Sequence, residues 1–366
     1  MHKIERLLQT LAPKGVGFRK LGEVCDFQKG KSITKKAVTF GKVPVISGGR
    51  QPAYYHNEAN RSGETIAISS SGVYAGYVSY WDIPVFLADS FSVSPKQKTL
   101  MPKYLFYYLT TQQDAIHATK SAGGIPHVYS KDLQNFLIPL PPLNEQIAIA
   151  NILSDVDHYL YALDALILKK ESVKKALSFE LLSQRKRLKG FNQAWQRARL
   201  GDICEITTGS LDANEMVHYG KYRFYTCAKE YYFIDKYAFD TEAILISGNG
   251  AYVGYVHYYK GKFNAYQRTY VLDNFSEHII FVKYFLTMFL QSHIQTNKNE
   301  GNTPYIVMAT LKDFEIFLPP LNEQIAIANI LSDLDSEIIS LKNKKRQFDN
   351  IKKALNHDLM SAKIRV

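Results

Sequence analysis

The sequence of 366 residues lacks several features that mark a secreted, membrane or metal-binding protein. It has three cysteines, Cys25, Cys204 and Cys227, and their odd number and wide spacing argue against a disulfide framework and a four-thiolate zinc site. No uninterrupted run of about 18 apolar residues is present, and the opening MHKIERLLQT has no apolar signal region. We therefore expect a soluble, cytoplasmic protein with reduced cysteines.

Motifs of nucleotide and metal chemistry are incomplete or missing. QKGKSIT at 28–34 contains the GKS of a phosphate-binding loop, but Cys25 stands where that loop requires its first glycine. NTPY at 302–305 is similar to the Asn-Pro-Pro-Tyr of adenine methyltransferases, but its second residue is Thr303 and no glycine-rich cofactor loop precedes it. The ten histidines form no HExxH motif. We therefore expect neither catalytic residues nor a metal site.

Positive charge is in excess, with a formal net charge of +11. Basic residues cluster at 29–36, 169–175, 185–189 and 342–346. Such an excess suits a polyanionic partner, although lysines on long helices can serve solubility alone. The 25 tyrosines fit the same interpretation if they lie on loops, where Tyr beside Lys and Arg contacts bases and phosphates. Tyrosines buried in sheets would give the same count.

The sequence contains an internal repeat with a period of about 178 residues. PPLNEQIAIANILSD occupies 141–155 and recurs unchanged at 319–333. ISSSGVYAGYVSYW at 68–81 pairs less closely with ISGNGAYVGYVHYY at 246–259. A period this long indicates duplicated domains rather than a solenoid.

Each half consists of a variable block followed by a helical block. The variable blocks contain short apolar runs bounded by Gly, Pro, Asn and Ser, which are typical of strands, and one short helix, so we predict an α+β fold for each. Asn144 is the expected N-cap of the first long helix, with Glu145 in its first turn. The predicted boundaries are 1–143 for the first block with a short N-terminal helix, 144–188 for the first long helix, 189–321 for the linker and second block, and 322–366 for the second long helix.

Apolar residues recur along both helical blocks at alternating spacings of four and three, the pattern of a narrow coiled-coil seam. The seam residues are Ile149, Leu153, Val156, Leu160, Leu163, Ile167, Ile327, Leu331, Leu334, Ile338 and Leu341. We predict that the two helices pair antiparallel, because the connection at 189–199 is short, and that a pseudo-twofold axis relates the halves. In this arrangement the helices separate the two blocks. The alternative is that each helix packs only on its own block.

The order of these segments resembles that of the specificity subunits of type I restriction-modification systems, over essentially the whole chain. The resemblance is carried by PLPPLNEQIAIANILSDVD and LPPLNEQIAIANILSDLD at the helix starts, and by FRKLGEV and RKRLKGFNQAWQRARLGDI at the entries to the blocks. It implies a non-catalytic DNA-binding subunit whose two target-recognition domains each read one half of a bipartite site in double-stranded DNA. It also implies helices that set the gap between the half-sites and dock two methyltransferase subunits.

The same resemblance implies where the cofactors of the complex are bound. S-adenosylmethionine is expected on the methyltransferase subunits, which methylate adenine N6, and ATP with magnesium on motor and endonuclease subunits. No cofactor is expected in this chain. Two other classes stay open: a methyltransferase or nuclease fusion that acts alone, and a scaffold that does not bind DNA.

Candidate DNA contacts come from loops that recur at the same place in both halves but differ in sequence. They are Lys29, Lys31, Ser32, Lys35, Lys36, Arg50, Ser70, Ser71, Tyr74, Lys120 and His127 in the first half, and Thr207, Thr208, Ser210, Lys229, Asn249, Tyr252, Arg268, Lys298 and Tyr305 in the second. We expect Lys and Arg mostly at phosphates, and Asn, Ser, Thr and Arg at base edges. The alternative for each is an ordinary exposed loop side chain.

Overall fold

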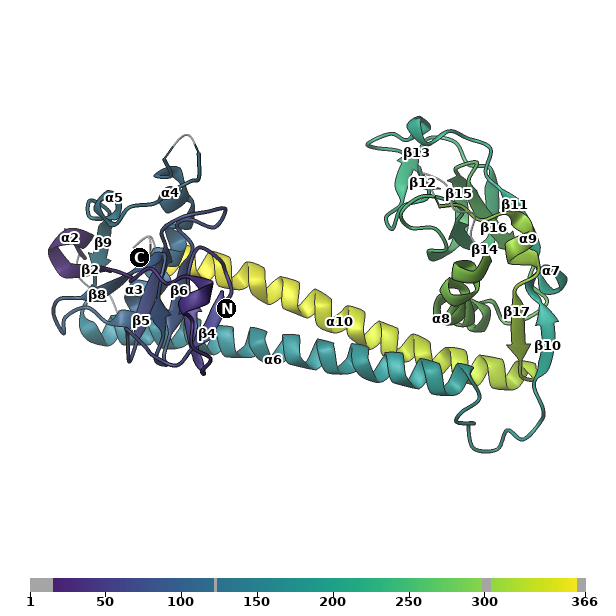
Figure 1. Ribbon diagram of the computed structural model, residues 1–366. Helices are drawn as coiled ribbons and strands as arrows, with labels where there is room; N and C mark the ends of the chain where they lie inside the picture. Colours follow the sequence, from purple (N-terminus) through teal and green to yellow (C-terminus); the bar gives the residue numbers. More distant parts are fainter. Residues whose placement is uncertain (1–15, 122–123, 298–303, 361–366) are drawn as a thin grey trace. The chain divides into compact units, whose positions relative to one another are not determined.

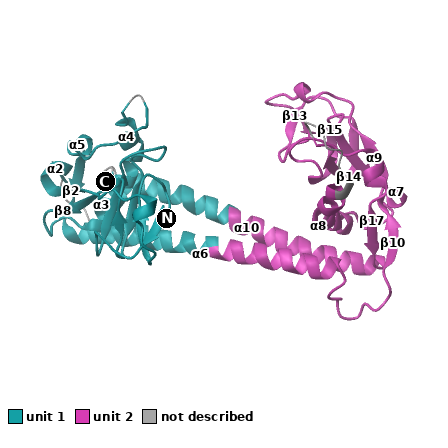
Figure 2. Cartoon of the chain, viewed as in Figure 1, with its two compact units in different colours: residues 1–164, 343–366 teal, residues 165–342 magenta. Residues whose placement is uncertain are grey.

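The computed structural model describes residues 16–121, 124–297 and 304–360 (Figure 1). The chain divides into two compact units: unit 1 comprises residues 1–164 and 343–366, and unit 2 comprises residues 165–342 (Figure 2). Two helices of 40 residues, α6 (Leu143–Leu182) and α10 (Leu321–Met360), contribute to both units. The predicted N-terminal helix lies outside the described residues.

Besides the long helices, the described part of unit 1 contains three small sheets and four short helices. β1 (Gly17–Lys20) pairs with β9 (Leu137–Leu140), and a four-stranded sheet has the order β2 (Cys25–Lys29), β8 (Ser90–Pro95), β5 (Thr65–Ser69), β6 (Val78–Trp81). A third sheet has the order β4 (Tyr54–His56), β3 (Val43–Ile46), β7 (Phe86–Leu87), with β3 and β7 parallel. The helices are α2 (Leu21–Val24), α3 (Pro102–Thr111), α4 (Gln113–Ala118) and α5 (Ser130–Leu133), with a 3-10 turn η1 at Lys35–Ala37.

Unit 2 repeats this plan with its two larger sheets joined into one. β10 (Gln196–Arg199) pairs with β17 (Glu315–Leu318). The six-stranded sheet has the order β11 (Glu205–Thr208), β16 (Thr269–Asp273), β14 (Phe239–Ser247), β15 (Val256–Ala265), β12 (Tyr222–Tyr225), β13 (Tyr232–Ile234). The helices are α7 (Leu200–Ile203), α8 (Ile279–Asn297) and α9 (Met308–Lys312), with a 3-10 turn η2 at Ala213–Glu215. The predicted pair of α+β blocks is therefore confirmed.

The core of each unit includes turns from both long helices. In unit 1, the side chains of α3 and the sheet pack with Ile149, Ala150 and Leu153 of α6 and with Leu359 and Met360 of α10. In unit 2, the side chains of α8 and its sheet pack with Leu181 and Leu182 of α6 and with Ile327, Ala328 and Leu331 of α10. Each long helix thus packs on both blocks, so the alternative in which each helix packs only on its own block is wrong.

Ion pairs show the direction in which the helices run within each unit. In unit 1, Lys345 on α10 contacts Asp164 on α6 at 2.7 Å, and Lys352 contacts the earlier Asp157. In unit 2, Lys170 contacts Glu337 at 2.8 Å, and Lys174 contacts the earlier Asp335. In both units, residues later in one helix therefore pair with residues earlier in the other. The predicted antiparallel pairing is confirmed in both units.

Most of the predicted seam side chains are withdrawn from solvent. The buried ones are Ile149, Leu153, Leu160, Leu163, Ile167, Ile327, Leu331 and Ile338, and the half-buried ones are Val156, Leu334 and Leu341. An alternating spacing of four and three keeps such residues on one side of a helix. The burial of these positions is what that pattern requires.

A buried glutamine anchors the start of each long helix, at the same place in both copies of the repeated segment. The Gln146 amide accepts from Met101 N at 2.9 Å and donates to the carbonyls of Thr99 and Pro141, both at 2.9 Å. The Gln324 amide accepts from His278 N at 3.0 Å and donates to Pro319 O at 2.8 Å and Glu277 Oε2 at 2.6 Å. Buried polar groups require such partners, so a substitution at either glutamine leaves several groups unpaired.

The ends of the first long helix differ from the prediction. Asn144 is its second residue rather than its N-cap; the carbonyl of Pro142 accepts from the N–H groups of Glu145 and Gln146 at 2.9 and 3.1 Å. The helix also ends at Leu182, before the predicted residue 188, because Gln184 takes a left-handed conformation with φ of 63°, which stops a helix. Within the predicted linker, residues 196–199 form β10.

Candidate nucleic-acid interface

One loop in each unit has the same backbone although most of its side chains differ. It follows β5 in unit 1 and β14 in unit 2, and each copy has two glycines with positive φ: Gly72 and Gly76, both at 85°, and Gly250 and Gly254, at 81° and 79°. Glycine adopts this conformation without the penalty that a Cβ brings. The recurring glycines therefore preserve the shape of the loop, while the residues between them differ except for the shared Tyr74 and Tyr252.

A second loop, more than 50 residues later in the chain, lies against the first one. In unit 1, Ser71 forms a β-bridge with His127, and Gly72 N donates to Pro126 O at 3.0 Å. In unit 2, Asn249 forms the same bridge with Tyr305, and Gly250 N donates to Pro304 O at 2.9 Å. The predicted contacts Ser71 and His127 therefore meet in space, as do Asn249 and Tyr305. The sequence carries no spacing rule from which this contact could be derived.

A cation lies over the equivalent tyrosine of the loop in each unit. The Arg50 guanidinium is 4.9 Å from the ring centroid of Tyr74, and Lys229 Nζ is 5.2 Å from that of Tyr252. Lys120 also reaches the first loop, where its Nζ donates to Val73 O at 3.4 Å. Its predicted counterpart Lys298 lies outside the described residues.

These residues form two equivalent surfaces. Loop surface 1 consists of Arg50, Ser70, Ser71, Tyr74, Lys120 and His127, and loop surface 2 consists of Lys229, Asn249, Tyr252, Arg268 and Tyr305. Arg268 belongs to the second because its carbonyl accepts from Gly248 N at 2.8 Å. Each surface combines a cation, a tyrosine and small polar groups, which together can hold a phosphate, stack on a base and hydrogen-bond to a base edge.

The remaining predicted contacts lie on a neighbouring segment. Lys29 ends β2, and the chain continues beside the first loop surface, since Gly30 N donates to Ser90 O at 2.8 Å and Lys31 N to Leu87 O at 2.8 Å. Ser32, Lys35 and Lys36 are exposed, as are Thr207, Thr208 and Ser210 in unit 2. Among the described residues, no hydrogen bond or ring contact joins Lys35 or Lys36 to loop surface 1.

Sequence reasoning missed two polar residues, one beside loop surface 1 and one elsewhere in unit 2. Asp89 accepts a hydrogen bond from the Ser71 hydroxyl. Arg223 lies between the rings of Tyr231 and Tyr259, at 4.2 and 4.5 Å from their centroids. No spacing pattern marks either residue, because each acquires its neighbours through sheet pairing.

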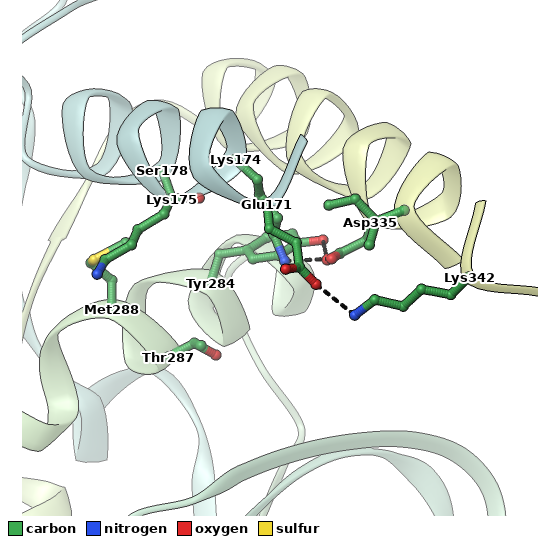
Figure 3. A pocket seen from close by; sticks show the side chains of 10 residues that line it. Glu171, Lys174, Lys175, Ser178, Tyr284, Thr287, Met288, Asp335 and Lys342 are labelled. Carbon is green, nitrogen blue, oxygen red and sulfur yellow. Dashed lines mark hydrogen bonds and ion pairs between the residues drawn. The ribbon is translucent and has the colours of Figure 1, made fainter. Parts of the chain in front are cut away.

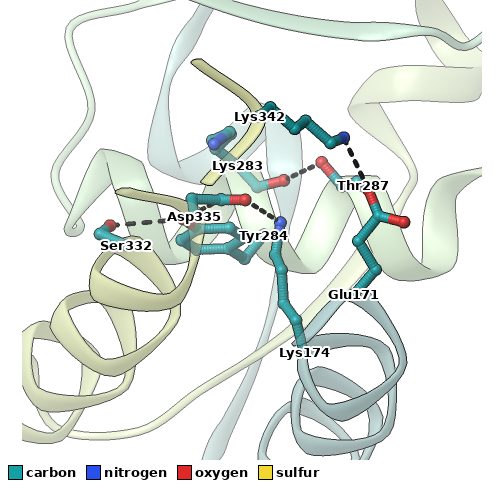
Figure 4. Close-up of polar contacts among 8 residues, drawn as sticks. All are labelled: Glu171, Lys174, Lys283, Tyr284, Thr287, Ser332, Asp335 and Lys342. Atoms are coloured by element: carbon teal, nitrogen blue, oxygen red, sulfur yellow. Dashed lines mark hydrogen bonds and ion pairs between the residues drawn. The ribbon is translucent and has the colours of Figure 1, made fainter. Parts of the chain in front are cut away.

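A tyrosine, an aspartate and a lysine recur where each block meets the long helices. In unit 1, Tyr107 Oη donates to Asp157 at 2.8 Å, and Lys352 pairs with the same carboxylate. In unit 2, Tyr284 Oη donates to Asp335 at 2.6 Å, and Lys174 pairs with it (Figure 4). The two sets occupy equivalent positions of the repeat, so the pseudo-symmetry extends to individual hydrogen bonds.

Burial and charge at the unit 2 set shift several pKa values. Burial and the hydrogen bond to Asp335 raise the pKa of Tyr284. Burial alone would raise the pKa of Asp335, but hydrogen bonds from Lys174 and Tyr284 outweigh it, so this pKa is lowered. The set borders a cavity of about 360 Å³ that Met288, Thr287 and Ser178 also line (Figure 3). The carboxylate stays ionised near neutral pH and holds α8 against both helices.

The described residues give no evidence of metal binding or of membrane insertion. Across 16–121, 124–297 and 304–360, no three His, Cys, Asp or Glu side chains are grouped as metal ligands would be. Over the same ranges, none of the helices combines the length and the apolar character that crossing a membrane requires.

The fold defines a duplicated protein, with two α+β modules that each present a loop surface and share two antiparallel helices. The family model described as type I restriction modification DNA specificity domain matches the chain twice, over residues 13–171 and 192–348. The chain therefore belongs to this family. The two matches follow the internal repeat.

Individual relatives agree with this assignment. The chain is 37% identical over 170 residues to the specificity subunit of the type I restriction enzyme EcoDI of Escherichia coli. The matched segment covers 46% of this chain but only 37% of that relative. The chain is 27% identical over 314 residues to the MjaVIII specificity subunit of Methanocaldococcus jannaschii, covering 74% of this chain and 72% of the relative. A crystal structure of a type I restriction-modification S subunit from M. genitalium shares the fold, with a TM-score of 0.74 and 21% identity over 95% of this chain and 96% of that one.

Proposed function

We propose that this chain is the non-catalytic, sequence-reading subunit of a type I restriction-modification complex, and that each unit reads one half of a bipartite site in double-stranded DNA. The observation that carries the proposal is the pair of equivalent loop surfaces, which keep one backbone and differ in side chains. Two readers of different sequences require this combination. The net charge of +11 supports a polyanionic ligand.

The proposal assigns different roles to the candidate residues. Arg50, Lys120 and Lys229 hold phosphates, as do Lys29, Lys31, Lys35 and Lys36 on the neighbouring segment. Ser71, His127, Asn249 and Tyr305, which meet at the β-bridges, face the base edges. Phosphate contacts position the protein, and base contacts specify the sequence.

The proposal also covers the partners and cofactors. Two methyltransferase subunits dock on the long helices and bind S-adenosylmethionine, and motor and endonuclease subunits bind ATP with magnesium. The incomplete nucleotide-binding motifs of this sequence support this division of labour. The complex acts on cellular DNA in the cytoplasm.

The isolated chain is expected to bind DNA but to transfer no methyl group. Addition of the cognate methyltransferase subunit should produce adenine methylation within one bipartite motif, measured by sequencing of the methylated DNA. Methylation by the chain alone with S-adenosylmethionine would show a stand-alone methyltransferase. Absence of DNA binding in gel shifts at low salt, with and without the partner, would show a pure scaffold.

Replacement of Lys35 and Lys36 together by Ala is expected to weaken DNA binding without changing the preferred sequence. The slope of log affinity against log salt is negative, and each lost phosphate contact makes it shallower by about 0.9. The double substitution therefore reduces its magnitude by up to about 1.8. The slope is measured by titration at several salt concentrations. The control replaces Lys169 and Lys353, which are exposed on the long helices, and leaves the slope unchanged. A changed sequence preference would identify the two loop lysines as base readers instead.

A further inference from the structure

Asp89 and Arg268 occupy the same position in the two repeats. Strand register shows the equivalence, since Ser69 pairs with Ser90 in unit 1 and Ser247 pairs with Thr269 in unit 2, each at the end of the ladder. Asp89 and Arg268 are the residues just before these partners. Their carbonyls also accept equivalent hydrogen bonds, from Ser70 N at 3.0 Å and from Gly248 N at 2.8 Å.

Both residues adjoin the base-facing part of their loop surface. Asp89 accepts from the hydroxyl of Ser71, the residue bridged to His127. Arg268 is bonded through its carbonyl to Gly248, which directly precedes Asn249, the residue bridged to Tyr305. Both are exposed. The two equivalent positions therefore present opposite charges on surfaces of the same shape.

A carboxylate on a DNA-binding surface restricts what it can contact. Phosphates repel it, and the hydrogen-bond donors that the major groove offers are the exocyclic amino groups of cytosine and adenine. The Ser71 hydroxyl donates a hydrogen bond to Oδ2 of Asp89. Within residues 16–121, 124–297 and 304–360, no other hydrogen bond to this carboxylate occurs. Oδ1 can therefore accept a hydrogen bond from the amino group of a base.

The arginine at the equivalent position donates hydrogen bonds and accepts none. Its guanidinium presents five donors in a planar fork, which matches the O6 and N7 acceptors of guanine. Within the described part of the chain, no ion pair or hydrogen bond occupies the side chain of Arg268. The neighbouring Lys229 lies over Tyr252, so a second cation is present for the phosphates.

We propose that residues 89 and 268 are a matched pair of base readers, in which Asp89 accepts a hydrogen bond from an exocyclic amino group in one half-site and Arg268 donates to a guanine in the other. This inference rests on the proposed function, because it requires each unit to read its own half-site. It adds Asp89, an acidic residue, to a surface otherwise defined by cations and small polar groups. It also predicts that the two half-sites differ in hydrogen-bonding character at equivalent positions.

The test uses the complex reconstituted with its methyltransferase subunits, and reads the motif by sequencing methylated adenines. Arg268→Lys keeps the charge but removes the fork, so discrimination in favour of guanine at one position of one half-site falls by about 5- to 150-fold. The dependence of binding on salt stays the same. Asp89→Arg installs the side chain of unit 2 in unit 1, and creates a guanine preference at one position of the other half-site.

The outcomes separate this inference from the function on which it rests. A bipartite wild-type motif that stays the same in Arg268→Lys and Asp89→Arg would overturn the inference and leave the proposed function intact. Changes in both half-sites from one substitution, or a wild-type complex without a bipartite motif, would overturn both. Asp89→Ala serves as a second variant, since it removes the carboxylate without introducing a new donor, and it is expected to relax one position of the same half-site that Asp89→Arg alters.

Discussion

Lengthening α6 and α10 by four residues each is expected to widen the unread gap between the half-sites by one or two base pairs, with both half-site sequences unchanged. Four residues add about 6 Å of helix and complete slightly more than one turn, so the seam still faces the partner helix. The proposed spacer role then requires the gap in the DNA to grow by the same distance. Since DNA rises about 3.4 Å per pair, 6 Å corresponds to one or two pairs.

One insertion point lies between Ala165 and Leu166, and the other between Asn343 and Lys344. Each is within two residues of a member of the ion pair between Asp164 and Lys345. Larger insertions are expected to fail, because each added base pair rotates the second half-site by about 35°. The same four residues inserted between Lys189 and Gly190, outside both helices, serve as the control and leave the gap unchanged.

Methylome sequencing measures the gap directly in cells that carry the lengthened protein. An unchanged gap with full activity would show that the helices do not set the spacing. Contacts between the recognition modules and the methyltransferase subunits would then set the spacing between the half-sites.

Gln324→Ala is expected to lower the free energy of unfolding of unit 2 by about 4 kcal/mol. The substitution removes three buried hydrogen bonds, one of them to the Glu277 carboxylate, and each neutral bond contributes about 1 kcal/mol and a charged one about 2 kcal/mol. Gln146→Ala removes three bonds to neutral backbone groups only. Its expected effect on unit 1 is therefore smaller, at about 3 kcal/mol.

The two tryptophans allow the units to be followed separately during denaturation. Trp81 lies in unit 1 and Trp195 in unit 2, so Trp81→Phe leaves a fluorescence signal from unit 2 alone. Asn329→Ala, an exposed change on the same helix as Gln324, is the matched control and is expected to have little effect. A loss below about 1 kcal/mol for Gln324→Ala would contradict the view that this glutamine anchors the helix to the block.

The local conformation of the chain follows in large part from its sequence. The alternating apolar residues of 143–182 and 321–360 predict long helices with one buried side, and Leu163 and Ile338 are buried as that pattern requires. The repeated glycines of the loops predict that two copies share one backbone shape. Periodicity and repetition act over neighbouring residues, so they can be recognised without knowledge of the rest of the fold.

Details that depend on backbone torsion at single residues were predicted less well. Asn144 was expected as the N-cap, but the helix begins one residue earlier, after Pro142. The first long helix ends at Leu182 because Gln184 has a positive φ. Residues other than glycine rarely adopt this conformation, so the sequence gives no reason to expect it there. Helix boundaries are set by such local competition, which a pattern of apolar residues does not resolve.

The sequence by itself determined the duplication, the α+β character of each block, the antiparallel helices and the basic polar loops that mark a DNA-specificity protein. Only the tertiary structure decided which of these loops come together. Ser71 meets His127, and Asp89 becomes the counterpart of Arg268, through strand register between segments far apart in the chain. Register depends on the packing of all the strands in a sheet, so no local property of Asp89 or Arg268 could reveal their equivalence.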